Sequence, residues 1–439
     1  MNDDSNSLRL SRRRMLGGLG VVGLASAGAG LGTTAYFNDV EAFVGNNLTA
    51  GSLDLFVHVD YEEDQGSYAQ YDIETVLNGN TVGEAIEGDP LRIEVDDAKP
   101  GDSGEGELCF SVVDNPAYLW VCGALTANDQ NGVTEPEGDA LEEMFETPPG
   151  EGQLADAMVV TLSYCTEGEE GETVMGDEIV SGSLREVLLA LRNGVPLDGE
   201  GDGAAPLDGR APFEGVATVE ETAETCVCLT WEIPTSVGNE IQTDSVMFDI
   251  DFYAEQSRHN DGTHNPCVTS REGGSFADTQ EELEDRVWHA RGIYGDGGGA
   301  ANRELDIRLP NDTPVHSGDE NYAWPNGQAV PFDLTISGGD AVWTIDDSTV
   351  TVSPAPVPVA DGIGVTAKAS TADASIDVEN IRLNGSAPAG PDSLSVSSGA
   401  SHLIFEGATL QEGDVISGDV TLTWTSTPSR EGLGFRIDV

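Results

Sequence analysis

The sequence predicts a mainly β protein: a jelly-roll-like β-sandwich with helical insertions, followed by a second, smaller antiparallel β-sandwich. Runs in which apolar and polar residues alternate recur along most of the chain, and clusters of Gly, Pro, Asn and Asp separate them. Helical periodicity is confined to two or three short segments. With 439 residues, the chain is long enough for two or three domains that each bury a core.

Acidic residues dominate the composition, with 79 Asp and Glu against 19 Lys and Arg and a formal net charge of −60. Such self-repulsion opposes a compact fold in dilute salt, but at 1 M salt a Debye length of about 3 Å screens most of it. The composition therefore indicates a halophilic protein. The alternative, an acidic disordered chain, is disfavoured by the persistent apolar alternation. The charge also argues against nucleic acid or an anionic membrane as a partner.

Residues 1–34 have the features of a twin-arginine signal peptide. Arg12 and Arg13 lie in the run Ser-Arg-Arg-Arg-Met-Leu, and a weakly apolar, Gly/Ala-rich stretch follows up to about residue 34. We therefore expect a secreted protein of the extracellular cell surface, with no membrane span in the mature chain. A retained membrane anchor is the alternative, but the many glycines disfavour a membrane helix.

Composition divides the mature chain into three parts. Residues 35–291 hold all the cysteines and mix strand and helix patterns, so they predict the larger sandwich. Residues 292–327 are rich in Gly, Pro, Asn and Asp and predict a linker. Residues 328–439 contain no cysteine and predict the C-terminal sandwich.

Within the first part, Ser183 and Glu186 form a capping box, and the apolar residues that follow at helical spacing predict a helix ending near Gly194. Acidic residues early and Arg286 and Arg291 late predict a second helix over residues 278–291, and a weaker pattern predicts a third over residues 139–146. Strands are expected over residues 159–164, 226–231 and 245–253, and in the last part over residues 332–336, 420–425 and 433–439.

The six cysteines are even in number, and export permits disulfides between them. They are Cys109, Cys122, Cys165, Cys226, Cys228 and Cys267. The pairing cannot be derived from the sequence, and buried free thiols remain an alternative. Cys226 and Cys228 lie two apart in a predicted strand and so share one face, which indicates different partners. A structural zinc site would require Cys-x₂-Cys spacing, which is absent.

Several short motifs occur in an order that resembles a known family. The mature N-terminus contains Ala35-Tyr36-Phe37-Asn38-Asp39-Val40-Glu41 and then Asn47-Leu48-Thr49-Ala50-Gly51-Ser52-Leu53. Further motifs follow at residues 99–105, 114–120, 243–245 and 254–260. Residues 35–267 thereby resemble a haloarchaeal form of the TasA/camelysin family, whose bacterial members have the so-called SipW-dependent type of signal peptide. The region from about Tyr322, with Trp324-Pro325-Asn326-Gly327, resembles more weakly the choice-of-anchor domains of surface proteins.

The family resemblance implies a jelly-roll sandwich. It also implies, as in several members, an extracellular filament of biofilm matrix or a pilus in which the N-terminal segment of one subunit completes the sheet of the next. The candidate donor strand here spans residues 36–44, with Tyr36, Phe37, Val40, Phe43 and Val44 as apolar anchors. The alternative is that this strand pairs within its own sheet. The twin-arginine leader and the extra C-terminal domain depart from the family pattern.

Camelysin-type members have been called metalloproteases, but no histidine here begins the His-Glu-x-x-His motif. The closest pair, His259 and His264, lies in an Asn/Asp/Gly-rich loop pattern. We therefore expect no catalytic residues, no metal site and no cofactor. A weaker hypothesis places Ca²⁺ in an acidic loop at residues 60–64, against the simpler interpretation of a solvated surface. The sequons at Asn47, Asn311 and Asn384 are candidate glycosylation sites.

Together these patterns predict a secreted, non-enzymatic structural protein of the cell surface or matrix. A filament subunit assembled by donor-strand exchange is the specific hypothesis that the family resemblance adds. Its expected partners are further copies of itself or other surface proteins. A glycan- or ligand-binding surface module is the alternative, and a secreted metalloprotease is a weaker one.

Overall fold

The computed structural model describes residues 53–66, 70–81, 91–92, 98–145, 150–168, 172–273, 288–294, 304–311, 313–318, 320–356, 362–428 and 432–439. The expected signal peptide with Arg12 and Arg13, the candidate donor strand and Asn47 lie outside these residues. Within the described ranges, no helix is both long enough and apolar enough to cross a membrane.

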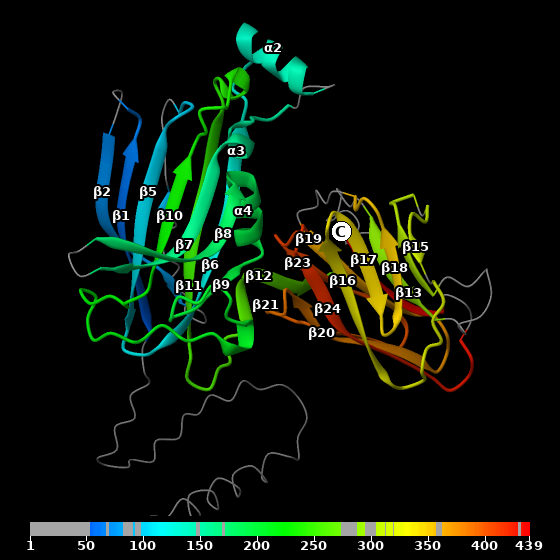
Figure 1. Ribbon diagram of the computed structural model, residues 1–439. Helices are drawn as coiled ribbons and strands as arrows, with labels where there is room; N and C mark the ends of the chain where they lie inside the picture. Colours follow the sequence, from blue (N-terminus) through cyan, green and yellow to red (C-terminus); the bar gives the residue numbers. More distant parts are fainter. Residues whose placement is uncertain are drawn as a thin grey trace, which may run out of the picture. The chain divides into compact units, whose positions relative to one another are not determined.

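The predicted mainly β fold is confirmed: antiparallel sheets pack into two sandwich-like bodies (Figure 1). One sheet of the first sandwich has the order β2-β1-β5-β10-β7-β8, and the other has the order β3-β11-β6-β9, with β4 also paired to β11. The strands are β1 (Asp54–Asp64), β2 (Gln70–Asn78), β3 (Asn80–Thr81), β4 (Leu91–Arg92), β5 (Ser103–Val113), β6 (Ala117–Asp129), β7 (Val159–Glu167), β8 (Thr173–Ser183), β9 (Val195–Leu197), β10 (Cys226–Glu232) and β11 (Ser245–Gln256).

The core of the first sandwich forms where period-two alternation directs apolar side chains from both sheets inward. On β1, for example, Leu55, Val57 and Val59 are buried while the residues between them are more exposed. Phe110 of β5 contacts Phe252 of β11 edge-on, with ring centroids 5.0 Å apart. Contacts of this kind between the two inner faces hold the sheets together.

The second sandwich has two seven-stranded sheets, β14-β13-β25-β19-β23-β12-β21 and β15-β18-β17-β16-β24-β20-β22. Phe332, Trp343 and Phe435 form an aromatic cluster in its core. Its strands are β12 (His264–Glu272), β13 (His289–Ile293), β14 (Leu305–Arg308), β15 (Ser317–Gly318), β16 (Ala329–Ser337), β17 (Asp340–Ile345), β18 (Ser348–Val352), β19 (Gly362–Ala369), β20 (Ala374–Leu383), β21 (Ala387–Ala389), β22 (Leu394–Val396), β23 (Gly399–Glu406), β24 (Val415–Trp424) and β25 (Leu433–Asp438).

The domain boundaries expected from composition need correction. Residues 292–327 do not form a plain linker, since β14 and β15 lie within them. Tyr322 and Trp324 are buried in the second core, and Trp324 Nε1 donates a hydrogen bond to the Ile293 carbonyl at 2.7 Å. β12 and β13, assigned by composition to the first domain, also belong to the second sandwich. The Gly/Pro/Asn/Asp-rich composition therefore reflects turns around short strands.

Helix α4 (Leu184–Arg192) confirms the predicted capping box, with Ser183 and Glu186 bonded reciprocally. Helix α2 (Glu135–Met144) begins four residues before its expected start, because Thr134 and Glu137 form a second capping box that we missed. The helix expected over 278–291 is wrong at its end, since Trp288 is not helical and residues 289–291 belong to β13; residues 278–287 lie outside the described ranges. The remaining helical turns are α3 (Leu154–Ala157), η1 (Leu207–Gly209) and η2 (Asn239–Ile241).

All six cysteines form disulfides, and Cys226 and Cys228 have different partners, as their shared strand face indicated. Cys109–Cys226 and Cys165–Cys228 tie neighbouring strands of one sheet, whereas Cys122–Cys267 joins β6 to β12.

Asn193, just after α4, donates from Nδ2 to the Asp414 carboxylate at 2.8 Å. The Asn193 amide oxygen also accepts from the Thr409 backbone at 2.9 Å.

Residues 60–64 are not the acidic loop expected for a Ca²⁺ site, because they lie within β1. The cross-strand register places Glu74, Asp60 and Glu107 directly opposite one another on β2, β1 and β5. In the next row on the same face, Glu62 is directly opposite Glu105. Like charges in directly opposed positions destabilise a sheet, by about 0.2–1 kcal/mol per pair. Dissolved salt screens repulsion of this kind.

We therefore predict that Asp60→Asn lowers the salt concentration at which half of the protein is folded. The expected shift follows from removing two cross-strand repulsions, and circular dichroism during salt titration measures it. The matched control is Asp208→Asn, an exposed carboxylate in η1 away from the sheet. Equal shifts in the two variants would mean that total charge, and not the register of the carboxylates, sets the salt requirement.

Candidate functional site

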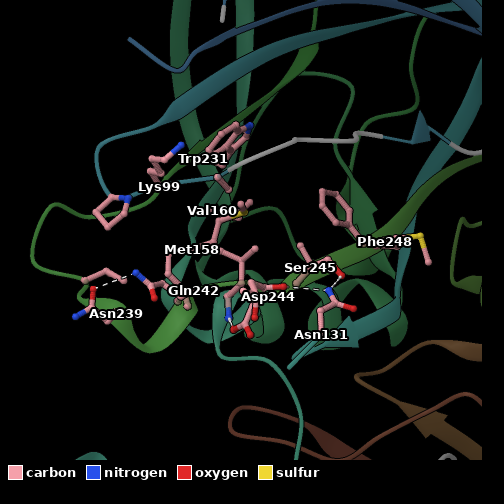
Figure 2. Close-up of a pocket in the computed structure, with 18 of the residues that line it drawn as sticks. Lys99, Asn131, Met158, Val160, Trp231, Asn239, Gln242, Asp244, Ser245 and Phe248 are labelled. Atoms are coloured by element: carbon pink, nitrogen blue, oxygen red, sulfur yellow. Dashed lines mark hydrogen bonds between the residues drawn. The ribbon is translucent and has the colours of Figure 1, made fainter. Parts of the chain in front are cut away.

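A groove of about 1030 Å³ opens between the two sheets at one end of the first sandwich (Figure 2). Apolar side chains from both sheets and from the loops beside them line it. They are Leu154, Met158, Val160, Leu229, Trp231, Val237, Ile241, Val246 and Phe248. Most of these side chains are buried, and Val237 and Val246 are the partly buried ones among them.

The strand pattern explains why apolar residues reach this end of the sandwich. Val160 of β7 and Trp231 of β10 are directly paired across the first sheet, so both project from the same face. Phe248 projects from β11 of the opposite sheet, next to a register shift at Met247 and Phe248. Polar rim residues, including Asn239 and Gln242, surround this apolar surface (Figure 2).

The indole ring of Trp231 is held in place by a hydrogen bond to Tyr61 and by close packing against the backbone of Gly104. Its Nε1 donates to the Tyr61 hydroxyl at 2.9 Å, and burial raises the pKa of Tyr61. Gly104 lies beside the indole, and a Cβ at this position would be 2.4 Å from Trp231 Nε1. Only glycine leaves room for the ring, which forms part of the groove wall.

A turn at residues 243–245 shapes the other wall, and it is one of the motifs that carried the family resemblance. Thr243 has a positive φ of 70°, and its Oγ1 donates to the Gly132 carbonyl at 2.6 Å. Asn131 Nδ2 donates to the Thr243 carbonyl at 3.1 Å and to Ser245 Oγ at 2.7 Å (Figure 2). These bonds fix the point at which β11 starts.

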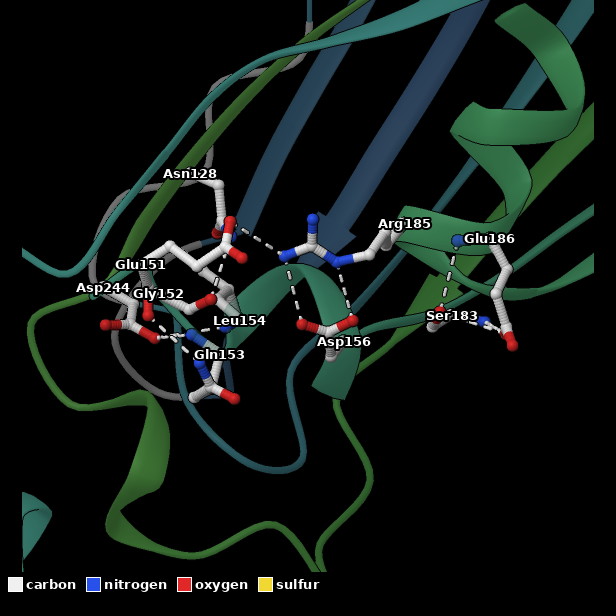
Figure 3. A network of polar contacts seen from close by, with 10 residues as sticks. All are labelled: Asn128, Glu151, Gly152, Gln153, Leu154, Asp156, Ser183, Arg185, Glu186 and Asp244. Atoms are coloured by element: carbon white, nitrogen blue, oxygen red, sulfur yellow. Dashed lines mark hydrogen bonds and ion pairs between the residues drawn. The ribbon is translucent and has the colours of Figure 1, made fainter. Parts of the chain in front are cut away.

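Asp244 anchors the same turn to the start of α3. Its Oδ2 accepts from the backbone N–H groups of Gln153 at 2.5 Å and Leu154 at 3.1 Å (Figure 3). Burial raises the pKa of Asp244, and these two bonds oppose that rise. Arg185 pairs with Asp156 of α3 at 2.8 Å, so α4 holds the same helical turn from the other side (Figure 3).

β1 begins at the end of the sandwich opposite the groove. β1 begins at Asp54, paired with Val113, and ends at Asp64, paired with Ser103. The groove lies at the Ser103 end, because Ala98, Lys99 and Pro100 line it. The 11 residues of β1 span about 33 Å between the two ends, at a rise of about 3.3 Å per residue.

The histidines expected to matter for a metalloprotease do not form a described metal cluster. Among the residues that the structure describes, one cluster brings three potential metal-ligating side chains together, and it consists of Glu107, Cys109 and Cys226. Cys109 and Cys226 are bonded to each other, so they are not available as thiolate ligands. His259 lies in the expected loop with a positive φ of 67°, and His264 begins β12.

The two sequons within the described residues differ in accessibility. Asn384 donates from Nδ2 to Asp414 at 2.8 Å and accepts from the Val415 N–H at 2.9 Å, so its amide is occupied inside a turn. Asn311 is exposed, and its Oδ1 accepts from the Thr313 N–H at 3.0 Å. The structure therefore favours Asn311 over Asn384 as a glycosylation candidate.

For the glycan-binding alternative, exposed aromatics on a sheet face would be the supporting feature. In the described part of the second sandwich, Phe332, Trp343 and Phe435 lie in the core. Tyr294 and Trp424 are partly buried and contact each other edge-on at 4.9 Å. This arrangement offers no stacking platform for a sugar ring among these residues.

Comparisons with known proteins leave the family open. No family model matches the chain, and no curated protein matches it. A solved structure of the N-terminal CBM22-1–CBM22-2 tandem domain from Paenibacillus barcinonensis Xyn10C aligns over 79% of this chain and 88% of that chain. The identity is 12% and the TM-score is 0.14.

We predict that Gly104→Ala destabilises the first sandwich by about 1–3 kcal/mol, the usual cost of overpacking. The added methyl group would displace Trp231 and deform the groove wall. Urea unfolding in high salt, followed by tryptophan fluorescence, measures the loss. Gly150→Ala is the matched control, because a Cβ there has no neighbour within 4 Å. Equal stability of the two variants would show that the Trp231 position tolerates movement.

Proposed function

We propose that this chain is a secreted, non-enzymatic structural protein of a halophile's cell surface or extracellular matrix. In this proposal, a strand from one copy enters the groove of another copy and so builds a filament. The observation that carries the proposal is the groove itself, an apolar opening into the sandwich beside β11. The candidate donor strand supplies apolar anchors of the required type in residues 36–44.

The physical basis is the addition of a strand to a sheet. An incoming strand gains main-chain hydrogen bonds along a sheet edge, and its alternate side chains fill apolar pockets. Among described residues, β11 is paired on its outer edge with β4 at Asp249 and Ile250 and with β3 at Tyr253 and Ala254. The part of β11 that lines the groove, from Ser245 to Phe248, has no described partner on that edge.

The opposite placement of the groove and the N-terminal entry supports a head-to-tail assembly. The candidate donor strand precedes β1 in the sequence, and β1 begins at the end of the sandwich opposite the groove. A contact between two different surfaces of identical subunits repeats without limit unless rotation closes a ring. A linear filament is therefore the expected product, with one free groove at one end.

Electron microscopy of residues 35–439 in high salt tests the proposal. We predict filaments for the unaltered protein and monomers for Val246→Asp, which places a carboxylate inside the groove. The matched control is Val180→Asp on β8, since both valines are partly buried and pack against the same core but only Val246 lines the groove. Circular dichroism confirms that each variant is folded.

A chain lacking residues 36–44 provides the second arm of the test. It should not polymerise alone, but its free groove should accept a donor strand and shorten filaments of the full chain. Filaments that persist in Val246→Asp would contradict the groove as acceptor. Monomers of the unaltered protein, with residues 36–44 protected from hydrogen exchange, would show that this strand pairs within its own sheet.

A further inference from the structure

Two disulfides lie side by side on the outer face of the six-stranded sheet. Cys226 is directly opposite Cys109 on β5 and directly opposite Cys165 on β7. It is bonded to Cys109, while Cys165 is bonded diagonally to Cys228. The four cysteines contact one another in a cluster of their own. Cys226 therefore has two neighbours at positions from which a disulfide can form, and it uses one of them.

The four sulfurs differ in their access to solvent. Cys165, Cys226 and Cys228 are 0%, 3% and 5% exposed, whereas Cys109 is only half-buried. Cys109 also lines a surface hollow of about 330 Å³ on this face, together with His58 and Glu74. An external thiol can reach this disulfide through the hollow, and Cys109 is the sulfur that it meets.

The walls of this hollow determine its chemistry. His58 is the direct cross-strand neighbour of Cys109, and its Nε2 lies 2.8 Å from Ser111 Oγ. An imidazole in this position can take the proton of an incoming thiol. Glu107 Oε1 lies 3.3 Å from Cys109 Sγ, and Glu107 Oε2 accepts from Thr173 at 2.7 Å. With Asp60 and Glu74 also in the wall, the hollow favours a cationic thiol over an anionic one.

We propose that Cys109 is a site of reversible covalent modification by a small cationic or neutral thiol, and that the neighbouring disulfide traps the product. An incoming thiolate attacks Cys109 Sγ, forms a mixed disulfide there and releases Cys226 as a thiolate. Cys226 then attacks Cys165 Sγ, which lies directly opposite, and forms the Cys165–Cys226 bond. Cys228 leaves as a thiolate and takes up a proton. Two disulfides exist before and after, so no oxidant or reductant is needed.

The second step makes the modification last. Without it, the Cys226 thiolate would attack Cys109 again and expel the bound thiol. When the second step occurs, the thiol released is that of Cys228, which is only 5% exposed. In the strand register Cys228 is opposite Glu107, so it is not the direct neighbour of Cys109. Cys122–Cys267 lies on other strands, outside this cluster, and takes no part.

Disulfide mapping after exposure to cysteamine tests the proposal on the intact, folded protein in high salt. Free thiols are then blocked with N-ethylmaleimide in acid. The expected result is cysteamine on Cys109, N-ethylmaleimide on Cys228, a Cys165–Cys226 bond and an unchanged Cys122–Cys267 bond. Cysteamine first on any other cysteine would overturn the assignment of Cys109. N-ethylmaleimide on Cys226, with Cys165–Cys228 intact, would overturn the exchange step.

Two further measurements separate the steps. Replacing both Cys165 and Cys228 by serine removes the trap, so the yield of the Cys109 adduct should fall severalfold while near-ultraviolet circular dichroism confirms the fold. An unchanged yield would contradict the trapping role. The adduct should also form about fivefold faster with cysteamine than with 2-mercaptoethanesulfonate, and this ratio should shrink as salt is raised. Equal rates at every salt concentration would rule out recognition by the carboxylates.

Discussion

Period-two alternation along the strands is the constraint on which the rest of this molecule depends. It places Leu55, Val57 and Val59 inside the first sandwich and places Asp60 and Glu62 in outward rows. The same pattern that builds an apolar core thus builds a dense carboxylate surface. The apolar contact between sheets favours folding, the opposed carboxylates resist it, and dissolved salt shifts the balance.

The same alternation accounts for both sites on the first sandwich. At the groove, inward positions such as Val160 and Phe248 form the buried lining, and Val246 beside them on β11 is only partly buried. On the outer face, Cys109, Cys226 and Cys165 occupy outward positions in one row, so their disulfides form between adjacent strands. One site uses the inner face and the other the outer face of the same sheet.

Local sequence signals predicted the elements well where each was self-contained. The capping box at Ser183 and the alternation around Trp424 needed only neighbouring residues, and both were confirmed. The prediction of a linker over residues 292–327 was wrong. A turn-rich composition is the same whether or not the short strands between the turns pair with a sheet. The expected helix end at Arg291 failed because long-range pairing with β14 and β25 outweighs a weak local pattern.

The candidate sites were harder to predict from the sequence than the individual helices and strands. The Thr134 capping box was readable as Thr-x-x-Glu and was simply missed. The groove and the cysteine pairing were not readable, because both depend on register between strands more than 60 residues apart, such as Cys165 and Cys228. The motif at residues 243–245 was noticed without a role, and its hydrogen bonds to Asn131, Gln153 and Leu154 show that it shapes the groove wall.

The most direct test of the account is to identify which chain occupies the groove. A photo-reactive amino acid in place of Asn239, on the groove rim, can be activated in an equal mixture of ¹⁵N-labelled and unlabelled protein in high salt. The account predicts cross-links from the groove to residues 36–44 in which half of the pairs join one labelled and one unlabelled chain. Cross-links confined to chains of the same label would contradict it, because the groove would then be filled by its own chain.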